Sequence, residues 1–447
     1  MTQAFDLLVR GGTCVLHRGI DRVDLGVTGG RITAIGDLSL ASAATVLDAR
    51  GLHVLPGVLD TQVHLREPGL EAKENLASGT QSAILGGVTG ILELPDTRPP
   101  TISAAALEDK ISRARARSFC DFACFLGASS EPEDFARLER LPGCAGVTLY
   151  MSGQPRPLLV DDDESLLRVL GRGHRRLSVH CEDESRASAR WPLVESGHGP
   201  SAHPDWRDET TASRATQRLL HLARRAGRRV HLMHLSCAEE LDPLAQHRDL
   251  ATAAVTVHHL TLAAPRCYDE LGTRALALPP IRDERHRNAL WRAVHDGLVD
   301  LVASDHAPHT REEKARDYPA APSGIPGVQT LLPVMLEHVH AGRLGLAQLV
   351  ELLSTGPARV FNMARKGRLA LGMDADLCLV DLAAERELTD AWIASRCAYT
   401  PYAGMRVHGW PLHTVLRGQL VVRDGALTGE QLGAPIRFSD TLRMVAL

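Results

Sequence analysis

One short stretch, residues 55–69 (LPGVLDTQVHLREPG), carries several side chains that could take part in chemistry. Asp60, Gln62 and His64 are two residues apart, so on a strand they would point to the same face. Arg66 follows, just before a Pro-Gly pair ends the strand and begins a loop. A metal-binding imidazole and a fixed guanidinium at a strand's carboxyl end are what an enzyme built on a barrel of parallel strands would place there.

Other apolar runs also carry polar residues at or near their ends. A single buried histidine is more often a hydrogen-bonded core residue than a ligand. Because the placement recurs in several runs, we expect a shared polar rim that could bind a metal ion, and three imidazoles with one carboxylate suit zinc. A rim without metal is the alternative. The residues are His64, Asp96, Thr148, His180, His234, His258, His259, Asp305, His306 and His309.

The elements that must position these residues are eight apolar runs, each followed by a helical or loop-like segment. Four of the intervening segments, 76–85, 104–117, 209–226 and 285–296, are polar on one side, as crossover helices should be. Eight such alternations predict a (β/α)8 barrel of the α/β class over residues 55–364. The runs are residues 54–64, 88–96, 120–129, 145–151, 176–183, 229–236, 252–260 and 298–306.

The two ends of the chain differ from the middle in their pattern of apolar and polar residues. Residues 1–54 and 365–447 show short alternating apolar and polar stretches broken by paired glycines. We therefore expect them to pair into one small β-sandwich domain that is discontinuous in sequence.

Composition narrows the class of protein. The net charge is -4 over 447 residues, so the chain lacks the excess of positive charge expected of a protein that binds nucleic acid or an anionic membrane. The nine cysteines form no CxxC pair, which favours reduced thiols in a cytoplasm. We find no pattern of a signal peptide and no apolar run long enough to cross a membrane. The expectation is a soluble cytoplasmic enzyme with a small-molecule substrate.

Several motifs together resemble the dihydroorotases of the amidohydrolase superfamily, in its cyclic amide hydrolase group. The resemblance covers essentially the whole chain and implies that His64, His180, His234 and Asp305 bind metal, with Asp305 also the general base. It further implies that Arg66 and His309 hold a substrate carboxylate, and that the backbone from Gly324 to Gly327 meets a pyrimidine ring. The motifs are DTQVHLREPG, GGVTGILELPDTRPP, SVHCED, HLMHLS, ASDHAPH and SGIPGVQTLLPVML.

Three positions depart from the pattern of these relatives. Gln62 stands where the family has a ligand histidine, and Thr148 where many relatives have a carbamylated lysine that bridges two metals. Two dications about 3.5 Å apart repel by nearly 20 kcal/mol at an effective dielectric of about 20, so we expect one zinc ion or none. Asp96 stands where dihydroorotases usually have an asparagine that contacts the substrate carboxylate. An ionised Asp96 would repel that group, so either Arg66 offsets its charge, the substrate differs, or the site no longer binds dihydroorotate. The alternative is that Asp96 simply pairs with Arg66 or Arg98 in an empty pocket.

Two functions of different classes follow. The first is a metal-dependent cyclic amidase that interconverts dihydroorotate and N-carbamoyl-aspartate in pyrimidine biosynthesis, with a hydantoin- or allantoin-type substrate as a variant. The second is a non-catalytic relative that acts as a structural partner of aspartate transcarbamoylase. In either case the resemblance implies self-association into a homo-oligomer.

Overall fold

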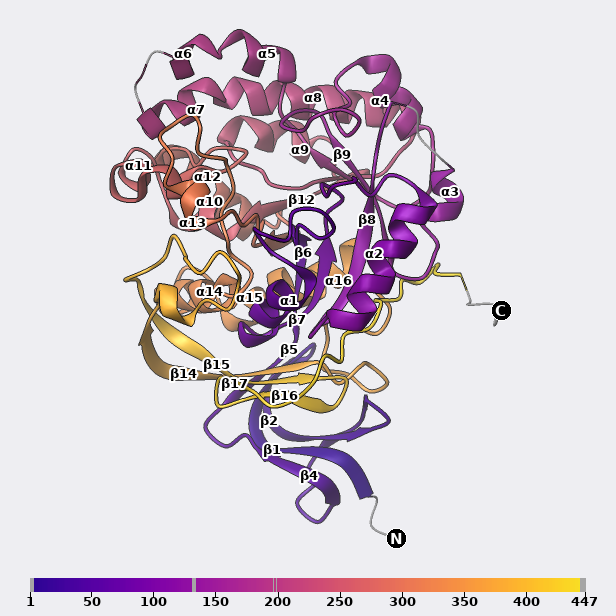
Figure 1. Cartoon of the computed structure of the whole chain (residues 1–447). Coiled ribbons are helices and arrows are strands. Elements are labelled where there is room, and N and C mark those ends of the chain that lie inside the picture. Colours follow the sequence, from indigo (N-terminus) through magenta and orange to yellow (C-terminus); the bar gives the residue numbers. More distant parts are fainter. Residues whose placement is uncertain (1–3, 131–133, 196, 198, 443–447) are drawn as a thin grey trace.

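Eight parallel strands form the barrel in the computed structural model, which describes residues 4–130, 134–195, 197 and 199–442 (Figure 1). Their order around the barrel follows the chain. The barrel closes after the last strand, where His306 N donates to Gln62 O at 3.1 Å and His64 N donates to His306 O at 2.8 Å. The predicted (β/α)8 barrel is therefore confirmed. The strands are β6 (Val58–Val63), β7 (Val88–Glu93), β8 (Asp121–Gly127), β9 (Cys144–Tyr150), β10 (Leu177–His180), β11 (Val230–Leu232), β12 (Ala251–Thr256) and β13 (Leu301–Ala303).

Helices cover the outside of the barrel, and polar caps explain where the longer ones begin. Asn75, Ser103 and Asp208 each accept a hydrogen bond from a backbone N–H in the first turn of the following helix. The longer helices are α1 (Leu76–Leu85), α2 (Ala104–Arg117), α4 (Asp163–Leu170), α8 (Glu209–Ala226), α12 (Glu284–His295) and α14 (Leu331–His340). The shorter ones are α3 (Phe135–Leu138), α5 (Glu184–Ala189), α6 (Pro192–Glu195), α7 (His203–Trp206), α9 (Leu241–Ala245), α10 (Val257–Thr261), α11 (Arg266–Leu271), α13 (Arg311–Lys314), α15 (Leu346–Val350) and α16 (Gly356–Val360).

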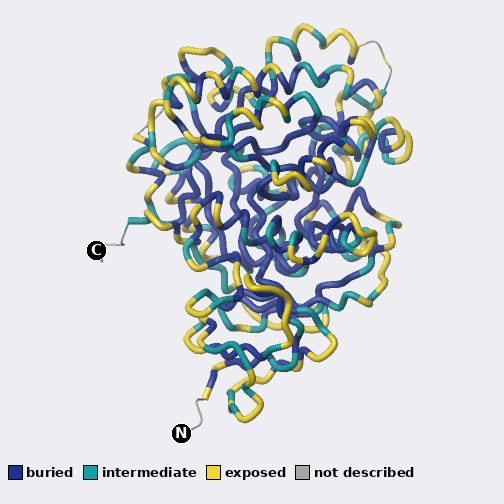
Figure 2. Tube along the Cα trace, turned by 180° about the vertical axis from the view of Figure 1, so that it is seen from behind, coloured by how far each residue is buried: buried dark blue, intermediate teal, exposed yellow. Residues whose placement is uncertain are grey.

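A cluster of buried apolar side chains joins the barrel strands to the last part of the chain. Leu59, Leu92 and Phe125 pack there with Phe361 and Phe438, which arrive from the last part of the chain. Figure 2 shows that the buried residues are concentrated in the centre of the barrel domain.

A second sheet of nine strands combines both ends of the chain, as predicted, and lies below the barrel in Figure 1. β5 joins the two ends because it pairs parallel with β1 and antiparallel with β14. The sheet encloses its own core, which includes Leu7, Leu25, Ile32, Val54 and Leu377. Its strands are β1 (Ala4–Leu16), β2 (Gly19–Thr28), β3 (Arg31–Gly36), β4 (Ser42–Asp48), β5 (His53–Pro56), β14 (Leu377–Glu387), β15 (Arg406–Leu416), β16 (Gln419–Arg423) and β17 (Ala426–Leu427).

The boundaries of the two domains stay a prediction, and two segments cross them. β5 ends at Pro56, two residues beyond the predicted boundary. The tail, although it falls within the range assigned to the sheet domain, packs on the barrel: Ile436 N donates to Phe122 O at 2.7 Å. Residues 1–3 and 443–447 of the predicted domain lie outside the described part of the chain.

Within the ranges that the structure describes, no helix combines the length and the apolar character needed to span a membrane.

Candidate active site

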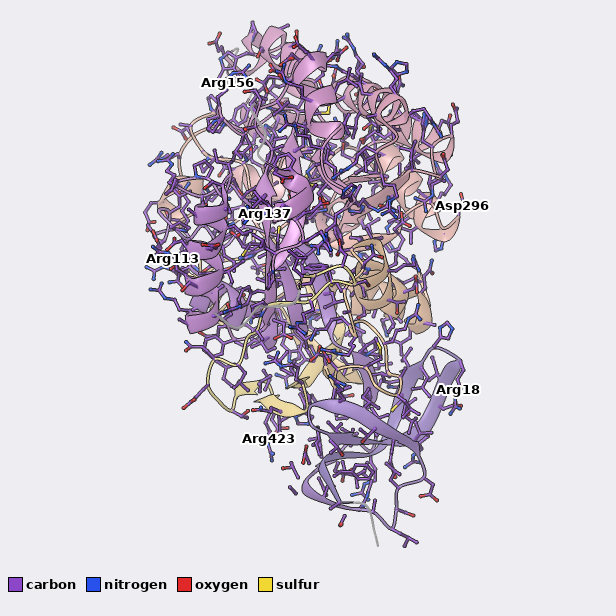
Figure 3. All side chains as sticks on the ribbon, turned by 90° about the vertical axis from the view of Figure 1, so that its right-hand side faces the viewer. Arg18, Arg113, Arg137, Arg156, Asp296 and Arg423 are labelled. Carbon is purple, nitrogen blue, oxygen red and sulfur yellow. The ribbon has the colours of Figure 1, made fainter. Side chains whose placement is uncertain are left out.

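A cavity of about 440 Å³ lies among the loops at the carboxyl ends of the barrel strands. Figure 3 places Arg156, which lines it, at the end of the molecule opposite Arg18 and Arg423 of the sheet domain. The lining includes all seven residues that the sequence assigns to metal or substrate binding: His64, Arg66, Asp96, His180, His234, Asp305 and His309. Of the ten residues expected at the polar rim, six therefore surround one space, whereas Thr148, His258, His259 and His306 do not line it.

Asp96 bridges His64 and Arg66 at one side of the cavity. Its Oδ1 lies 2.6 Å from His64 Nδ1, and its Oδ2 accepts a hydrogen bond from Arg66 Nη1 at 2.8 Å. Burial opposes the charged form of His64, but the Asp96 and Asp305 carboxylates outweigh it and raise the pKa of His64 to about 9. Although burial works in the opposite direction, His64 and Arg66 hold the pKa of Asp96 well below its usual range. The cluster is thus two cations around one carboxylate.

Asp305 and Arg66 are both held in a strained backbone conformation. Their φ angles are +49° and +63°, in the left-handed region that costs about 1–3 kcal/mol for a residue with a side chain. The hydrogen bonds of His306 that close the barrel hold Asp305 in place, and its Oδ1 lies 3.5 Å from His64 Nε2. Burial opposes ionisation of Asp305, but His64 and His234 lower its pKa below the usual range. Asp305 is therefore a carboxylate and can accept a proton.

His180 and His234 face each other at another side of the cavity. Nδ1 of His180 lies 3.0 Å from Nε2 of His234, and Nε2 of His180 lies 3.1 Å from Oε2 of Glu182. Burial favours the neutral form of Glu182, but Arg207 and His180 outweigh it and lower the pKa of Glu182 to about 2. An ionised carboxylate can only accept, so Nε2 of His180 carries a hydrogen and, in the neutral ring, Nδ1 presents its lone pair toward His234.

Gln62 and Thr148, the two altered ligand positions, do not line the cavity. Gln62 donates from its amide Nε2 to Met233 O, and its Oε1 is buried without a hydrogen-bond partner. Thr148 is fully buried on β9, and its Oγ1 also lacks a partner. Neither side chain supplies an imidazole or a bridging anion.

His309 has both ring nitrogens engaged. Lys73 Nζ lies 3.0 Å from Nδ1, and Nε2 lies 2.9 Å from Ser323 O. A carbonyl only accepts, so Nε2 carries the hydrogen; burial, with nearby Arg66 and Lys73, lowers the pKa of His309 to about 2. Gly324 packs against this ring, because a Cβ at that position would lie 2.3 Å from Ala307 O and 2.9 Å from His309. Its backbone lines the cavity, and the proposed contact of His309 with substrate stays a prediction.

The predicted strand run at residues 252–260 ends early, so His258 and His259 do not lie on a strand. β12 ends at Thr256, whose hydroxyl accepts from His259 N and begins the short helix α10. The two rings lie with centroids 4.6 Å apart. Both residues are buried outside the cavity lining, so they act in packing around the site.

The predicted metal ligands fit zinc in type and in pairs. The His64–Asp305 and His180–His234 contacts, at 3.5 and 3.0 Å, are close to the roughly 3.3 Å between two ligand atoms on a tetrahedral zinc ion. In the described residues, however, no three His, Cys, Asp or Glu side chains are arranged to hold one ion. The donor atoms are present, but they do not form a completed site.

Sequence reasoning missed several residues that shape the cavity. Glu182 was visible within the SVHCED motif, but its partner Arg207 lies 25 residues later. Tyr150 lines the cavity from β9, and its buried hydroxyl has no hydrogen-bond partner. Lys73 lies ten residues after the end of β6, the first barrel strand, and no sequence pattern links it to His309.

Comparisons with known proteins agree with this geometry. A model of the amidohydrolase family matches residues 53–421. The chain is 36% identical to a dihydroorotase from Halobacterium salinarum over 403 residues, which are 89% of this chain and 93% of that protein. It is 33% identical to an allantoinase from Deinococcus radiodurans over 447 residues, covering 97% and 99%. A solved structure of an L-hydantoinase (dihydropyrimidinase) from Arthrobacter aurescens has a TM-score of 0.91 at 28% identity, covering 97% and 100%.

Proposed function

The chain belongs to the amidohydrolase family, and we propose that it hydrolyses a cyclic amide, with dihydroorotate as the leading substrate. The observation that carries the proposal is the convergence of His64, His180, His234 and Asp305 with Arg66 on one cavity at the barrel mouth. This arrangement combines a proton acceptor with side chains of the types that bind zinc.

The protein's own residues have separate tasks in the proposed reaction. Asp305 accepts a proton from the attacking water and passes it to the ring nitrogen that leaves, while the water oxygen bonds to the carbonyl carbon and the C–N bond breaks. Glu182 orients His180, and Asp96 orients His64. His64, His180, His234 and Asp305 would hold a zinc ion, which when bound lowers the pKa of a water to about 7 and polarises a carbonyl.

The relatives support the reaction class more strongly than the substrate. Dihydroorotases and allantoinases match over nearly the whole chain at similar identity, and the solved structures include hydantoinases. What favours an acidic ring is Arg98, because it lines the cavity and, unlike Arg66 and Arg156, is not paired with a carboxylate of the described residues. An allantoin- or hydantoin-type substrate is the second candidate.

The test is a hydrolysis assay of the purified chain with dihydroorotate, allantoin and hydantoin. We expect dihydroorotate to turn over fastest and Asp305→Asn to reduce the rate at least about 1000-fold, since the general base is lost. Asp317→Asn, on the exposed surface, is the matched control and should keep full activity. Absence of turnover with all three rings, together with co-purification of a transcarbamoylase, would support the non-catalytic role instead.

A further inference from the structure

Three guanidinium groups line the cavity, and two of them are already paired with carboxylates. Arg66 is paired with Asp96 at 2.8 Å, and Arg156 with Asp161 at 3.0 Å. Arg98 has no ion pair and no side-chain hydrogen bond with any residue that the structure describes. It is therefore the arginine of the lining whose charge is not offset.

The backbone beneath Arg98 is fixed even though its side chain is exposed. Arg98 N donates to Pro68 O at 2.9 Å, and Thr97 N donates to Pro95 O at 2.9 Å. Gly69, with φ +89°, packs directly below, because a Cβ there would lie 2.0 Å from Arg98 O. The loop thus holds an exposed guanidinium on a rigid base at the edge of the cavity.

The buried charges do not favour an incoming carboxylate at Arg66. Asp96 is within hydrogen-bond distance of Arg66 and offsets its positive charge. Asp96 is also a carboxylate in a poorly solvated place, so it repels another anion. A substrate carboxylate is better stabilised where a guanidinium has no such neighbour.

We propose that Arg98 is the specificity-determining residue that binds the carboxylate of an acidic ring substrate at the cavity mouth. The inference rests on the proposed function and names the residue that selects acidic over neutral rings. A guanidinium binds a carboxylate through two parallel hydrogen bonds, which gives direction as well as charge. A neutral ring offers Arg98 no such partner and gains nothing from it.

The test compares Arg98→Gln with the unaltered protein on an acidic ring, dihydroorotate, and a neutral ring, hydantoin. We expect KM for dihydroorotate to rise about tenfold with kcat within about twofold, and both constants for hydantoin to stay within about twofold. Arg98→Lys keeps the charge and should recover part of the affinity. Arg156→Gln removes an arginine that is already paired and should raise KM for dihydroorotate less than about threefold.

Two results would overturn the inference: an unchanged KM for dihydroorotate in Arg98→Gln, or an equal rise for both rings, which would indicate a purely structural role. Calorimetric binding of dihydroorotate separates this from failure of the proposed function. If no ring is hydrolysed but dihydroorotate binds and Arg98→Gln weakens binding about tenfold, the assignment of Arg98 stands and the hydrolase proposal fails. If dihydroorotate does not bind at all, both fail.

Discussion

Asp96 Oδ1 lies 2.6 Å from His64 Nδ1, and the two side chains are only 8% and 10% exposed. The same carboxylate also accepts from Arg66 through its second oxygen. One acidic side chain therefore fixes the ring of a predicted ligand and offsets the charge of a predicted substrate-binding arginine. Asp96 is one of the three positions at which the sequence departs from the dihydroorotase pattern that it resembles.

Replacing Asp96 by asparagine should strengthen binding of an acidic ring. Asp96→Asn removes a negative charge near the expected position of the substrate carboxylate and frees Arg66, so we expect KM for dihydroorotate to fall about tenfold, or about 1.4 kcal/mol. Steady-state kinetics measure this. The penalty of Arg98→Gln should shrink in the Asp96→Asn background, because Arg66 can then share the carboxylate.

The matched control for this prediction is Asp161→Asn. It also removes a carboxylate paired with an arginine of the cavity lining, but Asp161 is one-third exposed and its charge is screened by solvent. We expect a change of less than about twofold in KM. A rise in KM for Asp96→Asn would contradict the prediction that the charge of Asp96 opposes the substrate carboxylate.

Glu182 should control the orientation of His180. Glu182→Gln keeps the shape but can turn an N–H toward His180 Nε2, and it leaves Arg207 buried beside an uncharged group. We expect turnover to fall about 10- to 100-fold. The imidazole nitrogen shifts of His180, measured by NMR, should report a changed tautomer. Unchanged shifts together with full activity would contradict the role that we assign to Glu182.

The metal content should follow the residues at positions 62 and 148. As isolated, the chain should carry at most one zinc ion, because Gln62 and Thr148 supply neither an imidazole nor a bridging carbamate. Gln62→His combined with Thr148→Lys should increase bound zinc, measured by elemental analysis after purification without added metal. The two single substitutions are the controls, and each should raise the zinc content less than the double variant does. No increase in the double variant would show that these side chains do not face the ligands.

The barrel and its rim could be predicted because they follow from local rules. Apolar runs that end in polar residues mark the carboxyl ends of parallel strands, and this placed His64, His180, His234 and Asp305 around one cavity. Helix limits were also accessible: the polar caps set α1, α2 and α8, and α12 begins one residue before the predicted start.

The missed features depend on contacts between distant residues. Arg207 reaches Glu182 from an irregular segment, and the tail packs on β8 across more than 300 residues of sequence. His258 and His259 were misplaced because the Thr256 cap begins a helix inside an apolar run that alone resembles a strand. No periodicity in the chain signals these contacts.

His338 should make the stability of the fold depend on pH below neutrality. Burial lowers the pKa of His338 from its ordinary value near 6.5 to about 4, and its Nε2 lies 2.9 Å from Thr261 Oγ1. The unfolded chain then takes up the proton first, so the stability is complete above pH 6.5 and is lost as the pH falls toward 4. At pH 4.5 this one group should cost about 2–3 kcal/mol relative to pH 7. Urea unfolding at pH 7 and pH 4.5 measures the stability lost on acidification. This loss should be smaller for His338→Gln than for the unaltered protein, by the cost of protonating His338.

His340→Gln, at the exposed end of the same helix, is the control and should lose as much stability as the unaltered protein. An equal loss in all three proteins would mean that His338 is already protonated in the fold, against the pKa that burial gives it.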